Sequence, residues 1–266
     1  MMQVEIPVYK LRQGKSPLMV SMPHTGTWLP QWLQPRLTEE ALALADTDWH
    51  LEQLYDFLDV LDATVLVATH SRYVIDLNRP PDNASLYPGQ STTSLCPLDS
   101  FSDRPLYLPG KTPDTAEAAA RIEQYWRPYH DTLSRELARL KTLHQSVVLW
   151  DAHSIRSVVP RFFEGELPQL NIGTADDQSC HPALTAVLAQ IAAASSYSGV
   201  ANGRFKGGYI TRRYGSPGQG VHAVQLEIAM RSYMKESAPY VLDEARAADL
   251  RPVLRQMMQA AVDWAA

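Results

Sequence analysis

The chain has 266 residues, 45% of them hydrophobic and 20% charged, with a formal net charge of −5. This composition is ordinary for a globular protein, and the acidic balance argues against nucleic acid as a partner. The apolar runs fall far short of the ~20 residues that a membrane-spanning helix needs, and the first residues lack the apolar core of a secretory signal. Only Cys96 and Cys180 occur, too few for a disulfide framework. We expect a single domain over residues 1–266, located in the cytoplasm.

The N-terminal half alternates apolar runs with polar turns. Residues 17–22 and 63–69 are predicted to be buried strands, because both are apolar and the second is rich in β-branched side chains. Residues 38–60 are predicted to form a helix with one apolar stripe. A loop rich in Pro, Ser and Thr follows over residues 78–113, and loops of that length inside compact domains are usually functional.

The C-terminal half continues this alternation. A long helix is predicted over residues 114–143, with a kink near Pro128. Further strands are predicted over 147–150, 170–173 and 222–230, and further helices over 181–194 and 243–264. Strands and helices that alternate without a break in composition predict an α/β fold with a mainly parallel sheet.

Two histidines lie just beyond predicted strands. His24 follows the first strand, and His153 follows the strand that ends at residue 150, two positions after Asp151. In open α/β sheets, ligands bind beyond the carboxyl ends of the strands. The pattern therefore predicts a site that both histidines share, although a histidine paired only with its neighbouring carboxylate is the structural alternative for His153.

The predicted site has the donors of a divalent metal centre. Zn²⁺ accepts imidazole nitrogen and carboxylate oxygen, and a catalytic zinc site uses three protein ligands plus water. The third ligand is expected from the acidic start of the helix at 38–60. Asp48 is the preferred candidate and Asp46 the alternative.

Glu227 is the next candidate. No Asp or Glu occurs over residues 178–226, and then a single carboxylate appears inside an apolar strand. A buried unpaired carboxylate is costly, so Glu227 needs a partner or a function. Two readings stay open: an ion pair with Arg212, Arg213 or Arg231, or a general base for a metal-bound water.

Cationic and amide side chains gather in two further places. Asn78 and Arg79 follow the apolar run at 73–77, and a glycine-rich stretch at 202–213 contains Arg204, Lys206, Arg212 and Arg213. Guanidinium groups bind carboxylates through two parallel hydrogen bonds. Singly, such residues are usually solvated. Together, in an acidic protein, they predict a small anionic substrate.

Five stretches together resemble the N-formylglutamate deformylase family. They are SMPHTGTWLP at 21–30, DTDWHLEQLYDFLD at 46–59, SRYVIDLNRPP at 71–81, LWDAHSIRS at 149–157 and GGYITRRYGSPGQGVHAVQLEIAMRSYM at 207–234. The family is similar to zinc carboxypeptidases and aspartoacylase. The resemblance implies a three-layer αβα fold with a mixed, mainly parallel sheet of eight-stranded type. It also implies hydrolysis of N-formyl-L-glutamate to L-glutamate and formate, in histidine degradation.

The resemblance also implies roles for individual residues. His24, Asp48 and His153 are expected to hold Zn²⁺ or another divalent ion such as Co²⁺. The relatives' His-x-x-Glu motif is broken here, because Thr27 stands three residues after His24. Asp48 is therefore an inferred replacement. Glu227 is expected to be the general base.

The remaining expectations concern the substrate. Arg72 is expected to help stabilise the oxyanion, Asn78 and Arg79 to hold one carboxylate, and Arg212 with Arg213 or Lys206 to hold the other. Alternatives are another metal-dependent deacylase, acting on an N-acyl acidic amino acid or a peptide amide, and an anion-binding relic of a hydrolase without activity. The sequence leaves the metal and the oligomeric state open.

Overall fold

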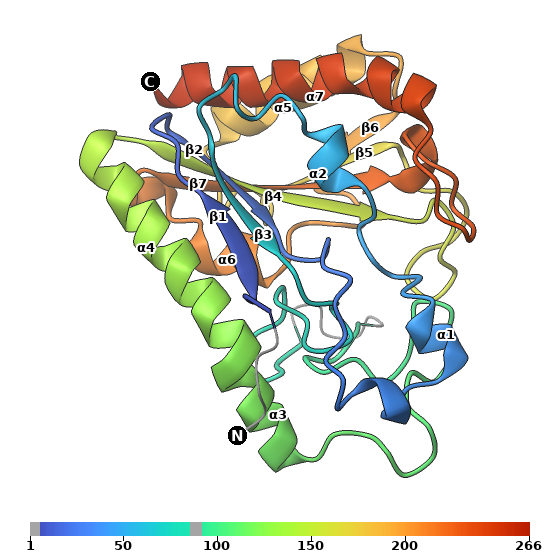
Figure 1. The fold of residues 1–266 in the computed structure, drawn as a ribbon. Helices are drawn as coiled ribbons and strands as arrows, with labels where there is room; N and C mark the ends of the chain where they lie inside the picture. Colours follow the sequence, from blue (N-terminus) through green and yellow to red (C-terminus); the bar gives the residue numbers. More distant parts are fainter. Residues whose placement is uncertain (1–5, 86–91) are drawn as a thin grey trace.

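The computed structural model describes residues 6–85 and 92–266 (Figure 1). Seven strands in these residues form one sheet: β1 (Tyr9–Arg12), β2 (Leu18–Met22), β3 (Thr64–Ala68), β4 (Val147–Ile155), β5 (Leu170–Gly173), β6 (Gly199–Ala201) and β7 (Val221–Ala229). Their order is β1-β3-β2-β4-β7-β5-β6. The central strands β3, β2, β4 and β7 run parallel, whereas β1 pairs with β3 and β5 with β7 in antiparallel fashion. The prediction of a mixed, mainly parallel sheet is confirmed.

Helices cover both faces of the sheet. They are α1 (Glu39–Leu42), α2 (Leu51–Leu54), α3 (Thr115–Arg121), α4 (Arg127–Leu143), α5 (Pro182–Ala194), α6 (Tyr209–Tyr214) and α7 (Glu244–Ala265), with a π-helical segment, η2 (Ile122–Trp126), and short 3-10 turns at η1 (Gln34–Arg36), η3 (Pro217–Gln219) and η4 (Met230–Ser232). Figure 1 shows α5 and α7 on one side of the sheet and α4 on the other. The predicted three-layer arrangement is therefore present.

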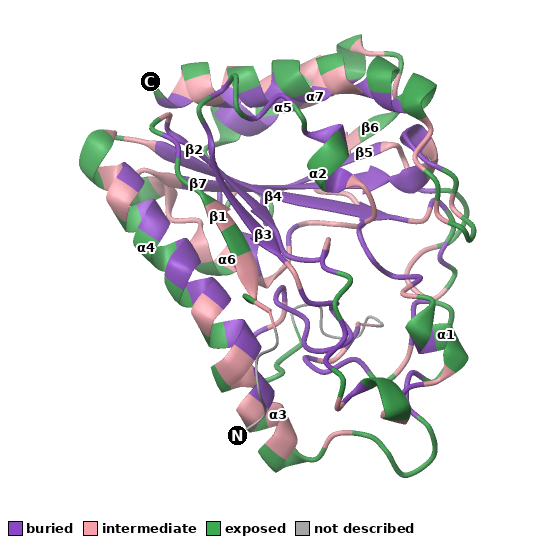
Figure 2. Ribbon diagram, viewed as in Figure 1, coloured by how far each residue is buried: buried purple, intermediate pink, exposed green. Residues whose placement is uncertain are grey.

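Strand alternation divides the core between the two faces. On β2, Leu18, Val20 and Met22 join the apolar cluster formed with α2, α5 and α7, whereas Met19 joins the cluster formed with α4. Successive side chains of a strand point to opposite faces, so a strand covered on both sides is apolar throughout. Figure 2 shows the central strands buried along their length. Because both faces of these strands are buried, the strands could be predicted from the sequence as continuous apolar runs.

The prediction of one continuous helix over residues 38–60 is wrong. Only the single turns α1 and α2 form, and between them Leu44 and His50 adopt φ values of 53° and 62°. Left-handed backbone of this kind ends a helix. The backbone N–H of Asp48 donates to the carbonyl of His24 at 3.0 Å. This hydrogen bond between distant parts of the chain places Asp48 beside the turn after β2. It prevails over the apolar periodicity, which favours a continuous helix through this segment.

Strand β4 is longer than predicted. It continues beyond residue 150 to Ile155, with all nine residues buried, so Asp151 and His153 lie within the strand and not in a loop after it. The edge strands β1 and β6 and the short helix α6 were not predicted. Strands β1 and β6 are largely half-buried or exposed, so they lack the continuous apolar run of the central strands.

The long helical segment before β4 is irregular near Pro128, as predicted. The irregularity is the π-helical segment η2, in which the backbone N–H of Arg127 donates to the carbonyl of Ile122. Proline cannot donate to the carbonyl four residues before it, so the hydrogen-bond pattern shifts in the preceding turn. Among residues 6–85 and 92–266, no helix has both the length and the apolar character needed to cross a bilayer.

The layer formed by α7 should dominate stability. Leu254 on this helix is fully buried, so Leu254→Ala should lower the free energy of unfolding by about 2–5 kcal/mol through lost burial and a residual cavity. Leu143 ends α4 with 55% of its surface exposed, and Leu143→Ala is the matched control, with a change below about 0.5 kcal/mol. Urea denaturation followed by circular dichroism measures both. Equal effects of the two substitutions would contradict this layering.

Candidate metal and active site

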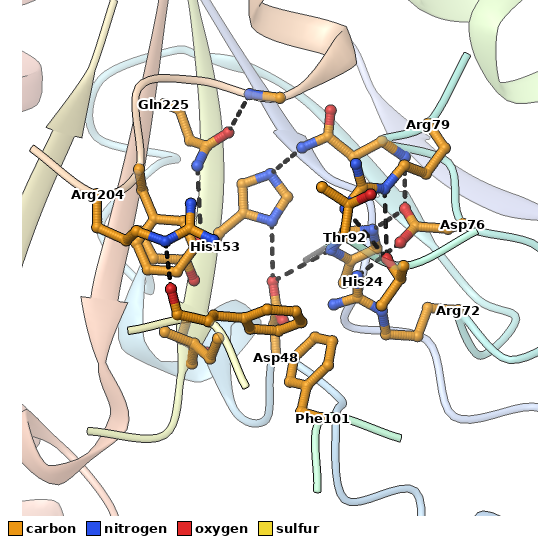
Figure 3. A pocket seen from close by; sticks show the side chains of 18 residues that line it. His24, Asp48, Arg72, Asp76, Arg79, Thr92, Phe101, His153, Arg204 and Gln225 are labelled. Carbon is orange, nitrogen blue, oxygen red and sulfur yellow. Dashed lines mark hydrogen bonds and ion pairs between the residues drawn. The ribbon is translucent and has the colours of Figure 1, made fainter. Parts of the chain in front are cut away.

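A pocket lies beyond the carboxyl-terminal ends of β2, β4 and β7 (Figure 3). His24 reaches it from the turn after β2, His153 from β4, and Glu227 from β7. The segments at 72–79 and 92–101 line it on one side, and the stretch after β6 lines it on the other. The carboxyl edge of a parallel sheet is the usual ligand-binding edge of this class of fold.

The three predicted metal ligands meet in this pocket. His24, Asp48 and His153 each offer one ligand atom, these atoms all lie within 4.8 Å of one another, and all three residues are buried. Asp48 Oδ2 lies 3.1 Å from His153 Nδ1 and 3.8 Å from His24 Nδ1. These residues are far apart in the sequence, so it is the fold that brings them together.

A second carboxylate orients each imidazole. His24 Nε2 lies 2.7 Å from Asp76 Oδ1, and His153 Nε2 lies 2.9 Å from Asp151 Oδ2. An ionised carboxylate only accepts hydrogen bonds, so both Nε2 atoms donate, and Nδ1 is the nitrogen of each ring that faces Asp48. Metal-binding histidines are typically held by outer carboxylates in this way. The two nitrogens and the Asp48 oxygen form a donor set that could hold a metal ion.

Asp46 lies outside this donor set. Its Oδ2 accepts a hydrogen bond of 2.8 Å from the backbone N–H of Phe101, and its Oδ1 lies 3.8 Å from Arg156 Nη2. Burial raises the pKa of the Asp46 carboxyl. Of the two aspartates left open by the sequence, Asp48 is the one whose geometry suits a ligand.

The electrostatics of the two histidines differ. Burial lowers the pKa of His24, and the cation of Arg72 adds to this effect against the opposing charge of Asp76. Burial would also lower the pKa of His153, but Asp151 and Asp48 overcome it and raise that pKa well above its ordinary value. The proton that Asp48 attracts to His153 is the one that a metal cation would replace, because ligand imidazoles bind metals in the neutral form.

Glu227 shares the pocket with His153. The two residues are register partners on the adjacent parallel strands β4 and β7, so their side chains leave the same face of the sheet. Burial raises the pKa of Glu227 to about 8, with Asp48 adding to the rise and His153 opposing it. A carboxyl group of this kind, poised near neutral pH, suits proton transfer.

The structure shows no ion pair between Glu227 and Arg212, Arg213 or Arg231 among the described residues. Arg231 lies 3.3 Å from Glu166, and Glu227 Oε2 instead accepts a hydrogen bond of 3.5 Å from Gln225 Nε2. Gln225 Oε1 in turn accepts from the backbone N–H of Gly208 at 2.7 Å. Gln225 therefore links the carboxylate to the glycine-rich stretch, a role that the sequence analysis missed.

Arg72 pairs with Asp76, the carboxylate that holds the His24 ring. Its Nη2 lies 2.6 Å from Asp76 Oδ2, and its guanidinium lies 4.7 Å from the centre of the Phe101 ring. Although burial opposes ionisation, Arg72 and His24 hold the pKa of Asp76 well below its usual range. Asp76 thus stays charged and fixes the His24 ring.

Asn78 and Arg79 both line the pocket. The Asn78 amide is already bound at both ends: Nδ2 lies 3.0 Å from His153 Nε2 and donates to Asp151 Oδ2 at 3.3 Å, and Oδ1 accepts from the backbone N–H of Ile210 at 2.8 Å. Arg79 donates through Nε and Nη2 to Thr93 Oγ1 at 3.3 and 3.1 Å. The Asn78 side chain therefore supports the His153 partner, while the Arg79 guanidinium is the cation at this side of the pocket.

The predicted second cationic anchor does not lie in the pocket. Lys206 lies 3.0 Å from Asp176 near the surface, and Arg212 Nε donates to the carbonyl of Gly207 at 3.0 Å. Arg213 is exposed on α6. None of these three side chains is among the described residues that line the pocket, so their role as a second anchor stays a prediction. Among described residues, the cations that line the pocket are Arg72, Arg79 and Arg204.

The residues that the sequence analysis missed had a visible signal. Asp76 stands two positions before Asn78 in a buried polar segment, and Gln225 stands two before Glu227, on the same face of β7. Polar groups two positions apart in a buried, otherwise apolar stretch point to a shared site, and the second pair lies within a strand. Phe101, which closes the pocket beside Arg72, had no signal in its local sequence.

Comparisons with known proteins point to one enzyme family. A family model described as N-formylglutamate amidohydrolase matches residues 16–234. The chain is 50% identical over 258 residues to the N-formylglutamate deformylase of Pseudomonas aeruginosa, covering 97% of each chain. It is 49% identical over 260 residues to the N-formylglutamate deformylase of Pseudomonas putida, again covering 97% of each chain.

Two solved structures share the fold. The crystal structure of N-formylglutamate amidohydrolase from Ralstonia eutropha has a TM-score of 0.83 at 23% identity and covers 98% of both chains. A gene product of Agrobacterium tumefaciens has a TM-score of 0.74 at 22% identity, covering 96% of this chain and 95% of that one. At these identities the likeness supports the fold alone.

The geometry predicts which aspartate binds metal. Asp48→Asn should lose most of the bound divalent ion after dialysis, because the amide removes the anionic oxygen from the donor set. Asp46→Asn is the matched control and should keep the wild-type metal content. Elemental analysis of both variants loaded with Zn²⁺ under the same conditions measures this. Loss of metal from the Asp46 variant alone would reverse the assignment.

Proposed function

The chain belongs to the N-formylglutamate amidohydrolase family, and from this premise we propose that it hydrolyses N-formyl-L-glutamate to L-glutamate and formate. The observation that carries the proposal is the identity of 50% over 97% of both chains with a named N-formylglutamate deformylase. The pocket with a buried His24, Asp48 and His153 group beside Glu227 supports it. We place the reaction in a histidine degradation route.

The proposed metal is Zn²⁺, or another divalent ion such as Co²⁺, held by His24, Asp48 and His153. Two imidazole nitrogens and one carboxylate oxygen, each imidazole backed by a carboxylate, fit the ligand preferences of zinc. When bound, the ion would supply a water of lowered pKa and polarise the formyl oxygen. Its charge would also favour the ionised form of Glu227.

Glu227 acts in this proposal as the general base and then as the general acid. It accepts a proton from the water whose oxygen bonds to the formyl carbon. The same carboxyl then donates that proton to the departing amino nitrogen, as the bond between that nitrogen and the formyl carbon breaks. Its burial and the raised pKa support this role, because a group that titrates near the working pH both accepts and releases a proton readily.

Arg72 and Arg79 supply positive charge on one side of the pocket. Arg72 is fixed by Asp76 and contributes a positive potential where the oxyanion develops. Arg79 binds one carboxylate of the substrate, with Asn78 beside it. A guanidinium suits this task because its planar donors match a carboxylate.

The activity itself is directly testable. Purified protein should release formate from N-formylglutamate, and removal of metal by a chelator should abolish the release until Zn²⁺ or Co²⁺ is restored. N-formylaspartate and N-acetylglutamate should react more slowly. Preferred hydrolysis of the acetyl compound would assign a different deacylase, and no release from any of the three would contradict the proposal.

Glu227→Gln tests the proton-transfer role. The substitution keeps the shape of the side chain and removes its basicity, so kcat should fall by about 10²–10⁴-fold. Metal content should stay at the wild-type level. Glu123→Gln, at an exposed position on the helical segment before α4, is the control and should leave kcat unchanged. A Glu227 variant with wild-type turnover would remove the assigned role.

A further inference from the structure

We propose that Arg204 binds the side-chain carboxylate of the substrate and sets the preference for an acidic acyl-amino acid, an inference that rests on the proposed function. The substrate carries two carboxylates: one on the carbon next to the scissile amide and one at the end of the side chain. Two separated cations are needed to hold both. The sequence predicted the second cation on α6 or at Lys206, and these residues lie outside the pocket.

Arg204 lies across the pocket from the other cations. In Figure 3, Arg204 is on one side of His153, whereas Arg72 and Arg79 are on the other side. Arg204 belongs to the stretch between β6 and α6, and Arg79 to the segment that follows Asp76. The pocket therefore has two cationic walls, with the metal-binding histidines between them.

The side chain of Arg204 is held in place by its neighbours. Its Nε donates to the carbonyl of Phe162 at 2.5 Å, and its guanidinium lies 5.4 Å from the centre of the Phe205 ring. Both aromatic residues also line the pocket. A guanidinium that is already oriented loses less side-chain freedom when a carboxylate binds, which favours specific recognition.

The position of each cation assigns it to one carboxylate. The α-carboxylate sits one carbon from the scissile nitrogen, so its partner must lie near the reacting centre. Arg79 is assigned to it, because Arg79 lines the pocket on the same side as Asp76 and His24 (Figure 3). Arg72 is engaged with Asp76. Arg204, on the opposite wall, is the cation placed for the γ-carboxylate.

Matched substrates separate the two carboxylates. N-formylglutamine replaces the γ-carboxylate by an amide of the same shape, and N-formylisoglutamine does the same for the α-carboxylate. Arg204→Met should raise KM for N-formylglutamate by about 10- to 100-fold, the range expected for a lost charged hydrogen bond. The same variant should raise KM for N-formylglutamine far less, because a neutral amide forms no ion pair with the guanidinium. Arg204→Lys should recover part of the loss.

Arg79→Met is the complementary variant. It should impair N-formylglutamate and N-formylglutamine alike, and its effect should disappear with N-formylisoglutamine. Arg127→Met, on the exposed face of α4, is the control and should alter none of these values. A kcat of the Arg204 variant with N-formylglutamine close to the wild-type value also shows that this variant folds.

The outcomes distinguish this inference from the proposed function. If wild-type protein fails to hydrolyse N-formylglutamate, the proposed function is wrong. If wild-type protein hydrolyses it and Arg204→Met either has no effect or impairs both substrates equally, only the role of Arg204 is overturned. A loss specific to the γ-carboxylate in Arg213→Met instead would return that role to α6.

Discussion

The candidate site depends on the pairing of each of its two imidazoles with its own outer carboxylate. Asp76 binds Nε2 of His24, and Asp151 binds Nε2 of His153. These two bonds point both Nδ1 atoms toward Asp48, which lies between the rings. Without them, each ring could rotate about its side-chain bonds, and the three donors would no longer converge. The arrangement of the strands, the broken helix before α2 and the segment at 72–79 all contribute to this one geometry.

Buried charge makes the arrangement costly for the protein alone. Asp48, Asp76, Asp151 and Glu227 are all buried within one region, and the nearby cation Arg72 is engaged with Asp76. Buried carboxylates are tolerated when they are paired, hydrogen-bonded or bound to a metal. A divalent ion between the histidines would offset this excess of negative charge. The same ion would make the pocket attractive to an anionic substrate, in agreement with the cations on both of its walls.

The sequence predicted the layers and the grouping of His24, Asp48 and His153 better than the loops. Central strands were recognisable because burial on both faces makes them apolar throughout, and His24 and His153 could be placed at one edge because parallel strands share that edge. The break between α1 and α2 was not predictable, because the bond of Asp48 to the His24 carbonyl overrides helical periodicity. The sequence also showed that cations gather at 204–213, but not that Arg204, and neither Arg212 nor Arg213, is among the described residues lining the pocket, because this depends on the tertiary path of the chain.

The central claim is that a metal ion binds to the two Nδ1 atoms and to Asp48. A crystal structure of the zinc-loaded protein, with anomalous scattering measured at the zinc edge, tests it most directly. We expect one peak at about 2.0–2.2 Å from His24 Nδ1, His153 Nδ1 and an Asp48 oxygen, with Asp76 and Asp151 still bound to the Nε2 atoms. A peak elsewhere in the molecule, or ligation through Nε2 with the outer carboxylates displaced, would contradict the account.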